Sequence, residues 1–218
     1  MNWKWLKFVP WVDPRAKFIM TIPPKGHLLD LGSWDGSTLK HFLELRPDLK
    51  IYAVDIQKHP NLTQVQYTFH QADLETDTLP WPDNSMDAIT CMHLIEHLKN
   101  LSKLLAEVAR LLKPGACAYF EMPRPKTLTL DSIHGDNVGT FTMNFFDDPT
   151  HVNFVSTGRL AAWLTQRGLK IIDSGISRNI LIALAYPLTM FLGKNRRRFT
   201  AKAHWHGWSA YLIAKKTA

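Results

Sequence analysis

Apolar residues of the chain gather in short runs that alternate with stretches of helical spacing. The first run, HLLDL at 27–31, ends at Gly32, and the stretch that follows places Leu39 and Phe42 on one face of a helix. Further apolar runs have the length and composition of strands. We predict these strands at 50–56, 65–74, 86–94, 116–122, 169–177 and 208–216.

Helices are predicted between the strands, at about 100–112, where Lys113-Pro114-Gly115 ends the helical pattern, and at about 156–168. Strands that alternate with helices over such connections form right-handed parallel crossovers. The fold class is therefore α/β, with a sheet covered on both faces. Ligands of such sheets bind beyond the carboxyl ends of the strands, so the loops after the first four strands should converge on one site.

Two segments interrupt this alternation. Residues 123–153 show no sustained period, and we predict a long active-site loop with short helical turns. Residues 178–207 are too long for a hairpin turn, and they contain an apolar stretch at 180–193 followed by the basic run Arg196–Arg198. A stretch of this length is too short to span a bilayer, but it can lie along a membrane surface or close an apolar pocket.

Charge is unevenly divided along the chain, whose formal net charge is +7. Residues 1–25 carry a net charge of +4, residues 26–173 of −5 and residues 174–218 of +8. We therefore expect a basic, Trp-rich N-terminal extension (1–25) and a single domain (26–218). The first residues lack the apolar stretch of a signal peptide, and two cysteines cannot form a disulfide scaffold. These features predict a cytoplasmic protein.

The loop after the first strand, residues 30–37, carries the first candidate chemistry. Gly32 and Gly36 let the backbone turn sharply, and the next helix offers free N–H groups at its start. Asp55 ends the second strand, where a carboxylate can accept both hydroxyls of a ribose, and Asp73 could accept a hydrogen bond from an adenine amino group. The loop reads G-S-W-D-G-S, which fails the dinucleotide pattern, and a P-loop motif is absent.

Longer motifs resemble a known family. The segments LLDLGSWDGS, YAVDI, QADLETDTLPWPDNSMDAITCMHLIEHL and LLAEVARLLKPGACAYFEMP occur in this order. Together they resemble the class I S-adenosylmethionine-dependent methyltransferases, most closely the small-molecule branch of the ubiquinone/menaquinone-biosynthesis type. The resemblance covers about residues 26–177. It implies a Rossmann-like, seven-stranded, mostly parallel sheet with helices on both faces and an antiparallel last strand, and S-adenosyl-L-methionine as cofactor.

The resemblance also implies roles for individual residues. The methionine part of the cofactor would be lined by residues of the first loop: Asp30, Gly32, Ser33 and Gly36. The ribose and adenine would be bound by residues after the second and third strands: Asp55, Ile56, Asp73 and Leu74. Met92 and His93, after the fourth strand, would face the cofactor and its methyl group.

Trp34 departs from the family pattern, because it stands where the family usually has a second glycine. A tryptophan disfavours a backbone with positive φ. We therefore expect its ring either to point away from the cofactor or to cover it as a wall, and we count Trp34 among the cofactor-binding residues. The same substitution leaves open a non-catalytic reading, in which the fold binds S-adenosylmethionine as a regulator.

A hydroxyl or amine acceptor needs a base near neutral pH, which a histidine can supply. The candidates are His93, His134 and His151. We favour His151 because it ends the long loop that should roof the site, and Asp147 or Asp148 could orient its ring.

Other histidines receive no catalytic assignment. His97 is expected to pack or cap near a helix start. His204 and His206 form an H-x-H pair without a carboxylate or cysteine nearby, so no metal site is predicted. Cys91 lies inside a strand and is expected to belong to the core.

The basic ends of the chain suggest two kinds of partner. The apolar stretch 180–193 with Arg196–Arg198, and tryptophans near lysines, favour a lipid-linked or amphipathic small-molecule acceptor and a peripheral contact at the inner face of a membrane. The same charge could bind RNA phosphates, which would make the protein an RNA methyltransferase. We rank RNA lower because the neighbouring residues are aliphatic and offer no aromatic platform for base stacking.

Overall fold

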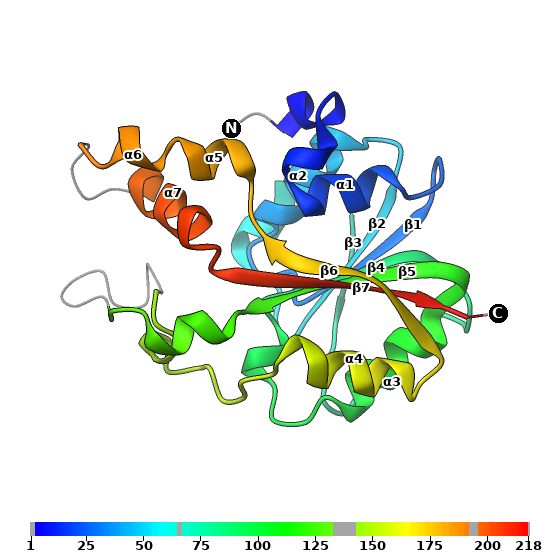
Figure 1. Cartoon of the computed structure of the whole chain (residues 1–218). Helices are drawn as coiled ribbons and strands as arrows, with labels where there is room; N and C mark the ends of the chain where they lie inside the picture. Colours follow the sequence, from blue (N-terminus) through cyan, green and yellow to red (C-terminus); the bar gives the residue numbers. More distant parts are fainter. Residues whose placement is uncertain (1–2, 65–66, 133–142, 192–195, 218) are drawn as a thin grey trace.

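A seven-stranded sheet forms the centre of the protein, in a computed structural model that describes residues 3–64, 67–132, 143–191 and 196–217. The spatial order of the strands is β3-β2-β1-β4-β5-β7-β6 (Figure 1). The strands are β1 (His27–Leu31), β2 (Lys50–Asp55), β3 (Thr68–Gln71), β4 (Met86–Met92), β5 (Leu112–Pro123), β6 (Leu169–Ser177) and β7 (Ser209–Lys216).

The directions of the strands confirm the predicted topology. Neighbours from β3 to β5 pair in parallel, while β7 lies between β5 and β6 and runs antiparallel to both. The strand order reverses between β1 and β4, which is where ligands of open α/β sheets bind.

Helices cover both faces of the sheet (Figure 1). On one face lie α1 (Pro14–Met20) and α2 (Ser37–Leu45), and on the other lie α3 (Ser102–Leu111) and α4 (Thr157–Thr165). Each helix turns an apolar stripe inward: Phe42 of α2 and Leu104 of α3 are fully buried in separate clusters on the two sides. Short 3-10 helices occur at Trp3–Lys7 (η1), Pro10–Val12 (η2), Pro60–Gln64 (η3), Ile95–His97 (η4), Pro125–Thr129 (η5) and Phe145–Asp147 (η6).

The N-terminal segment packs onto the core beside α2. Trp3 and Leu6 are buried in the same apolar cluster as Phe42. The side chain of Asp13 then caps α1 by accepting a hydrogen bond from the backbone N–H of Arg15. Residues of the predicted extension therefore contribute to the face of the sheet that α2 covers.

Three helices connect β6 to β7: α5 (Ile180–Leu184), α6 (Tyr186–Thr189) and α7 (Arg196–His206). Asn179 caps α5 by accepting from the N–H of Ile182, and its own N–H donates to Nδ1 of His204 in α7. The Asn179 amide also donates to Asp13 over 3.3 Å, which joins these helices to the N-terminal segment. Within the described part of the chain, each helix is too short or too polar to cross a bilayer.

Most predicted elements are present, but several boundaries differ, two of them most clearly. The third strand was predicted at 65–74, and in the described residues it is the short Thr68–Gln71. Lys113-Pro114-Gly115 was predicted to separate a helix from a strand at 116–122. Instead α3 ends at Leu111 and the three residues lie inside β5, because Leu112 already takes an extended backbone and pairs with Met86.

Candidate active site

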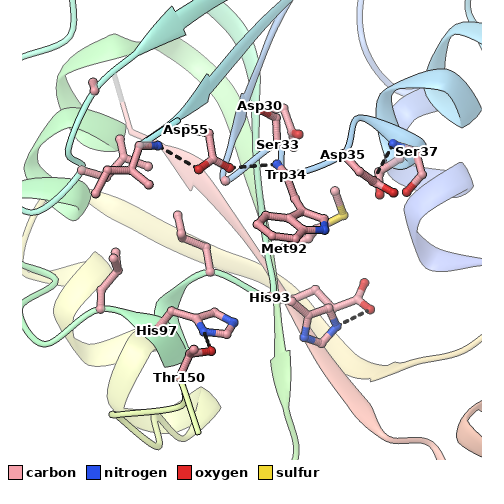
Figure 2. Close-up of a pocket in the computed structure, with 18 of the residues that line it drawn as sticks. Asp30, Ser33, Trp34, Asp35, Ser37, Asp55, Met92, His93, His97 and Thr150 are labelled. Atoms are coloured by element: carbon pink, nitrogen blue, oxygen red, sulfur yellow. Dashed lines mark hydrogen bonds and ion pairs between the residues drawn. The ribbon is translucent and has the colours of Figure 1, made fainter. Parts of the chain in front are cut away.

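A cavity of about 730 Å³ lies at the carboxyl ends of β1, β2 and β4. Its volume is typical of sites for small molecules, which span roughly 300–1,000 Å³. Ten of the eleven residues predicted to bind the cofactor line it (Figure 2). They are Asp30, Gly32, Ser33, Trp34, Asp55, Ile56, Asp73, Leu74, Met92 and His93.

The exception is Gly36, which packs against Leu62 and allows a backbone turn with positive φ. Its φ is +72°, and a Cβ there would collide with the Leu62 side chain. Gly32 has φ +78° and borders the cavity, where a Cβ would lie 3.0 Å from the Leu94 side chain. Both glycines therefore suit the positive φ of the turn, but only Gly32 lines the cavity.

Asp30 is a buried carboxyl at the end of β1. Burial raises its pKa to about 7, although a hydrogen bond from Thr90 Oγ1 over 2.6 Å favours the ionised form. A cationic ligand group beside it would favour ionisation. Asp30 therefore suits a site that receives positive charge.

Trp34 corrects the expectation drawn from the sequence, because it does adopt a positive φ of 42°. Its backbone N–H donates to Asp55 Oδ2 over 2.8 Å, and this bond holds the strained turn in place (Figure 2). Trp34 is 61% exposed and lines the cavity, and its ring packs at an angle against His59. Whether the ring covers the cofactor stays a prediction.

Asp55 and Asp73 stand at the same end of the cavity. Asp55 Oδ1 accepts from the N–H of Ile56 over 2.8 Å, so each of its oxygens holds one backbone donor and keeps a further lone pair. Asp73 also lines the cavity, and its Oδ1 accepts from the N–H of Glu75 over 2.8 Å.

His93 is held between two buried carboxylates. Its Nδ1 donates to Glu96 over 3.0 Å, and its Nε2 donates to Glu121 over 3.2 Å with Ser209 Oγ also in reach. Burial lowers the pKa of His93, but the bonds and charges of Glu121 and Glu96 outweigh it and raise the pKa to about 10. The ring is an imidazolium at neutral pH and has no lone pair to accept a proton. Geometry therefore argues against His93 as the base.

Arg15 is a cavity residue that the sequence analysis missed. Its guanidinium donates twice to Asp13 from α1, over 3.0 and 3.1 Å. Burial opposes its charge, but Asp13 and Glu121 hold the pKa of Arg15 above its ordinary range. The Asp-Pro start of α1 predicts a helix cap and carries no signal of a ligand, so only the packing of α1 against the sheet reveals this residue.

Two further histidines, His97 and His151, lie next to each other beside the cavity. His97, which we expected to pack or cap near a helix start, lines the cavity, and its Nδ1 lies 2.9 Å from Thr150 Oγ1. His151 lies behind it, with a ring only 5% exposed and Nδ1 2.6 Å from the Phe145 carbonyl oxygen. His134 lies outside the described residues.

The two acids proposed to orient His151 differ in what they do. Asp148 Oδ2 lies 3.9 Å from His151 Nε2, beyond hydrogen-bond distance. Asp147 accepts from the N–H groups of Met143 and Asn144 and so stabilises its own loop. Asp148 borders the cavity together with Thr150, so the long loop does reach the site.

The cavity fits the cofactor that the resemblance implies. Ser33 Oγ is buried at its wall and has no hydrogen-bond partner among the described residues, as expected for an atom that awaits a polar ligand. Carboxylates at one end suit hydroxyls and an amino group, and Met92 and Leu74 offer apolar surface. Gly32 brings backbone without a side chain to the cavity wall.

Comparison with known proteins agrees with this fit. A family model described as a methyltransferase domain matches residues 6–174. The chain belongs to this methyltransferase family. It is an S-adenosylmethionine-dependent methyltransferase of class I, and its cofactor is S-adenosyl-L-methionine.

Individual relatives show how far the similarity extends. The methyltransferase is 28% identical to a ubiquinone biosynthesis O-methyltransferase of Coxiella burnetii, over 73% of this chain and 70% of the relative. It is 34% identical to a dimethylglycine N-methyltransferase of Parasynechococcus marenigrum, over 68% of this chain and 52% of that protein. A solved S-adenosylmethionine-dependent methyltransferase from Mesorhizobium loti superposes with a TM-score of 0.66 at 16% identity, covering 96% of this chain and 98% of that one, and supports the fold.

Proposed function

We propose that this methyltransferase acts on a small-molecule acceptor that is amphipathic or lipid-linked and is reached from a membrane surface. The main support for the position of the cofactor site is the cavity at the carboxyl ends of the strands. It gathers ten of the predicted residues, and one of them, Ser33, has a buried hydroxyl without a hydrogen-bond partner among the described residues. The proposal that the acceptor is amphipathic or lipid-linked rests on exposed apolar residues, which are described below.

Five side chains would hold the cofactor. Asp55 would accept the ribose hydroxyls through its remaining lone pairs, and Asp73 would accept from the adenine amino group. Arg15 would pair with the carboxylate of the methionine part, and Asp30 with its ammonium group. Trp34 would form the outer wall. Each pairing matches opposite charges or a donor with an acceptor.

The bound cofactor supplies an electrophilic methyl group on a sulfonium. The protein contributes by positioning, because in-line approach of the acceptor sets most of the barrier. Met92 and the fixed His93 imidazolium border the space where the methyl would lie. His93 would orient the acceptor rather than deprotonate it.

Calorimetric titration with S-adenosylmethionine tests the cofactor site. Asp55→Ala should weaken binding by about 10- to 100-fold, since hydrogen bonds to a charged group contribute roughly 1.5–3 kcal/mol. Asp83→Ala is the matched control, because that carboxylate is 68% exposed and lies outside the cavity. Equal affinity in both variants would remove Asp55 from the site.

The acceptor proposal rests on exposed apolar side chains near both basic ends. In the N-terminal segment, the exposed aromatic residues are Trp5, Phe8 and Trp11, each between 64% and 69% exposed. In and after α5 and α6, the most exposed large apolar residues are Leu184, Leu188 and Phe191, the last 91% exposed. We call these six residues the apolar surface. Large apolar side chains next to lysines and arginines are typical of contacts with anionic lipid.

Co-sedimentation with vesicles tests this surface. The wild-type protein should sediment with phosphatidylglycerol vesicles and much less with phosphatidylcholine vesicles. Replacing Leu184, Leu188 and Phe191 by Ser should abolish sedimentation, whereas Ile172→Ser, an exposed apolar residue on β6, should leave it unchanged. If the triple variant binds vesicles as the parent does, or if salt-sensitive RNA binding replaces vesicle binding, the acceptor proposal fails.

A further inference from the structure

Glu96, His97 and His151 come together at the edge of the cavity. Glu96 and His97 belong to η4, and His151 belongs to the loop that follows η6. Each offers one ligand atom, and these atoms lie within 4.8 Å of one another. We infer that the three residues form a site for a divalent transition-metal cation of the zinc class.

The hydrogen bonds of the two rings use Nδ1 in each histidine and leave Nε2 free to bind an ion. Thr150 Oγ1 donates to Asp148 over 2.6 Å, so its oxygen accepts the Nδ1–H of His97. The Phe145 carbonyl can only accept, so His151 also carries its proton on Nδ1. Both Nε2 atoms therefore present a lone pair. Histidines that bind metals are commonly held in this way, with the other ring N–H bonded to a protein oxygen.

Glu96 supplies an independent observation. Its side chain is 2% exposed, and Oε1 accepts from His93. Oε2 is buried and has no hydrogen-bond partner within the described parts of the chain. A buried carboxylate oxygen without a partner is costly, and a cation bound beside the two imidazoles would satisfy it.

The backbone already holds the loop in place for such a site. The N–H groups of Val152 and Asn153 both donate to the carbonyl oxygen of Glu96, over 2.9 and 3.1 Å. His151 is thus fixed next to η4 before any ion binds. Ligand atoms around zinc lie about 2.0–2.2 Å from the ion, so the three side chains must draw together by roughly 1 Å.

The donor set selects the class of ion. Two imidazole nitrogens and one carboxylate oxygen favour zinc-like cations over magnesium or calcium, which prefer oxygen ligands. Three protein ligands would leave a coordination position open, and because His97 lines the cavity, an acceptor bound there would supply the remaining ligand. The role of the cation rests on the proposed function. It would bind the oxygen of an acceptor hydroxyl and lower the pKa of that hydroxyl, whereas the protonated His93 cannot remove a proton from it.

Cobalt binding tests the site directly. The full-length protein is stripped with chelator and titrated with Co²⁺ alone, without cofactor or acceptor, while the visible d–d absorption is recorded; Zn²⁺ is then added as competitor. We expect one equivalent of Co²⁺ to bind and Zn²⁺ to displace it. His97→Ala and Glu96→Gln should each weaken binding by at least about tenfold. His206→Ala, which removes a half-buried histidine from α7, should not.

Three results would overturn the inference: no cobalt absorption in the wild-type protein, equal binding in His97→Ala and Glu96→Gln, or loss of binding in His206→Ala. Circular dichroism of each variant checks folding, and His97→Ala decides the outcome if Glu96→Gln does not fold. Since neither cofactor nor acceptor is present, failure here leaves the proposed methyl transfer untouched. Failure of cofactor binding would likewise leave the metal site standing.

Discussion

Replacing Glu121 by Gln should lower the free energy of unfolding more than replacing an exposed acidic residue would. The Glu121 carboxylate is buried on β5 and accepts from His93, from Tyr119 over 2.9 Å and from Ser177 over 2.8 Å. Gln keeps the shape but removes the charge that balances the His93 imidazolium and Arg15. Breaking a buried ion pair costs about 3–5 kcal/mol. For a chain of this size, 3 kcal/mol lowers Tm by roughly 6–12 °C.

The same variant should change the pH dependence of stability. The pKa of His93 is raised to about 10 in the folded protein, from about 6.5 when unfolded. Its contribution is therefore complete below pH 6.5 and is lost as pH rises through 10. The pKa of Glu121 is held below its ordinary range, because Arg15 and His93 outweigh the effect of burial. Its contribution is thus present above about pH 4.3 and is lost in acid.

Urea denaturation at pH 6, 8 and 10 measures both effects. The free energy of unfolding of the wild-type protein should fall between pH 6 and 10, and that of Glu121→Gln should fall less. Asp83→Asn is the control, since an exposed ion pair contributes only about 0–1 kcal/mol. A Tm for Glu121→Gln equal to that of the control, or parallel pH profiles for all three proteins, would refute the assignment of this charge network.

Three further predictions follow from single sites. Because burial raises the pKa of Asp30 to about 7, calorimetry should show cofactor affinity rising as pH increases through 7, and Asp30→Asn should abolish that dependence. In Gly32→Ala, the added Cβ would lie 3.0 Å from the Leu94 side chain, on a backbone with φ at +78°. The variant should therefore bind the cofactor at least about tenfold more weakly while the protein stays folded. Unchanged affinity would contradict a close approach of the cofactor to this turn. Leu160→Ala, at a fully buried position of α4, should cost about 2–5 kcal/mol in urea denaturation, and a loss below 1 kcal/mol would contradict the described packing.

The sheet was predictable from the sequence because its strands are short apolar runs separated by turn residues. HLLDL and LKIIDSGIS match β1 and β6 residue for residue. Predicted boundaries were wrong where strand pairing outweighed the local sequence pattern. Lys113-Pro114-Gly115 is such a case, because Leu112 pairs with Met86 and the three residues therefore lie inside β5. The division of the chain at residue 25 stays a prediction.

The site was predictable only where residues follow strand ends. Gly32, Asp55 and Asp73 share this property, and they meet at one edge of the sheet. The backbone of Trp34 was mispredicted because a steric preference is local, whereas the hydrogen bond from its N–H to Asp55 comes from another strand. Arg15 gave no sequence signal, since it enters the cavity only through the packing of α1.

The charge state of His93 also required the structure. The two carboxylates that hold its proton lie three and 28 positions away in sequence, and one of them stands on a neighbouring strand. Sequence spacing placed the histidine at the site but could not show that its ring is fully bonded. The same limit hid the approach of His151 to His97, which depends on how the long loop returns to η4.

A crystal structure with bound S-adenosylhomocysteine tests the central claim most directly. We expect the ribose hydroxyls on the Asp55 carboxylate, the adenine beside Asp73 and Leu74, and a polar atom of the ligand on Ser33 Oγ. Density for the ligand elsewhere, with the indole of Trp34 filling the cavity and both acids facing solvent, would contradict it.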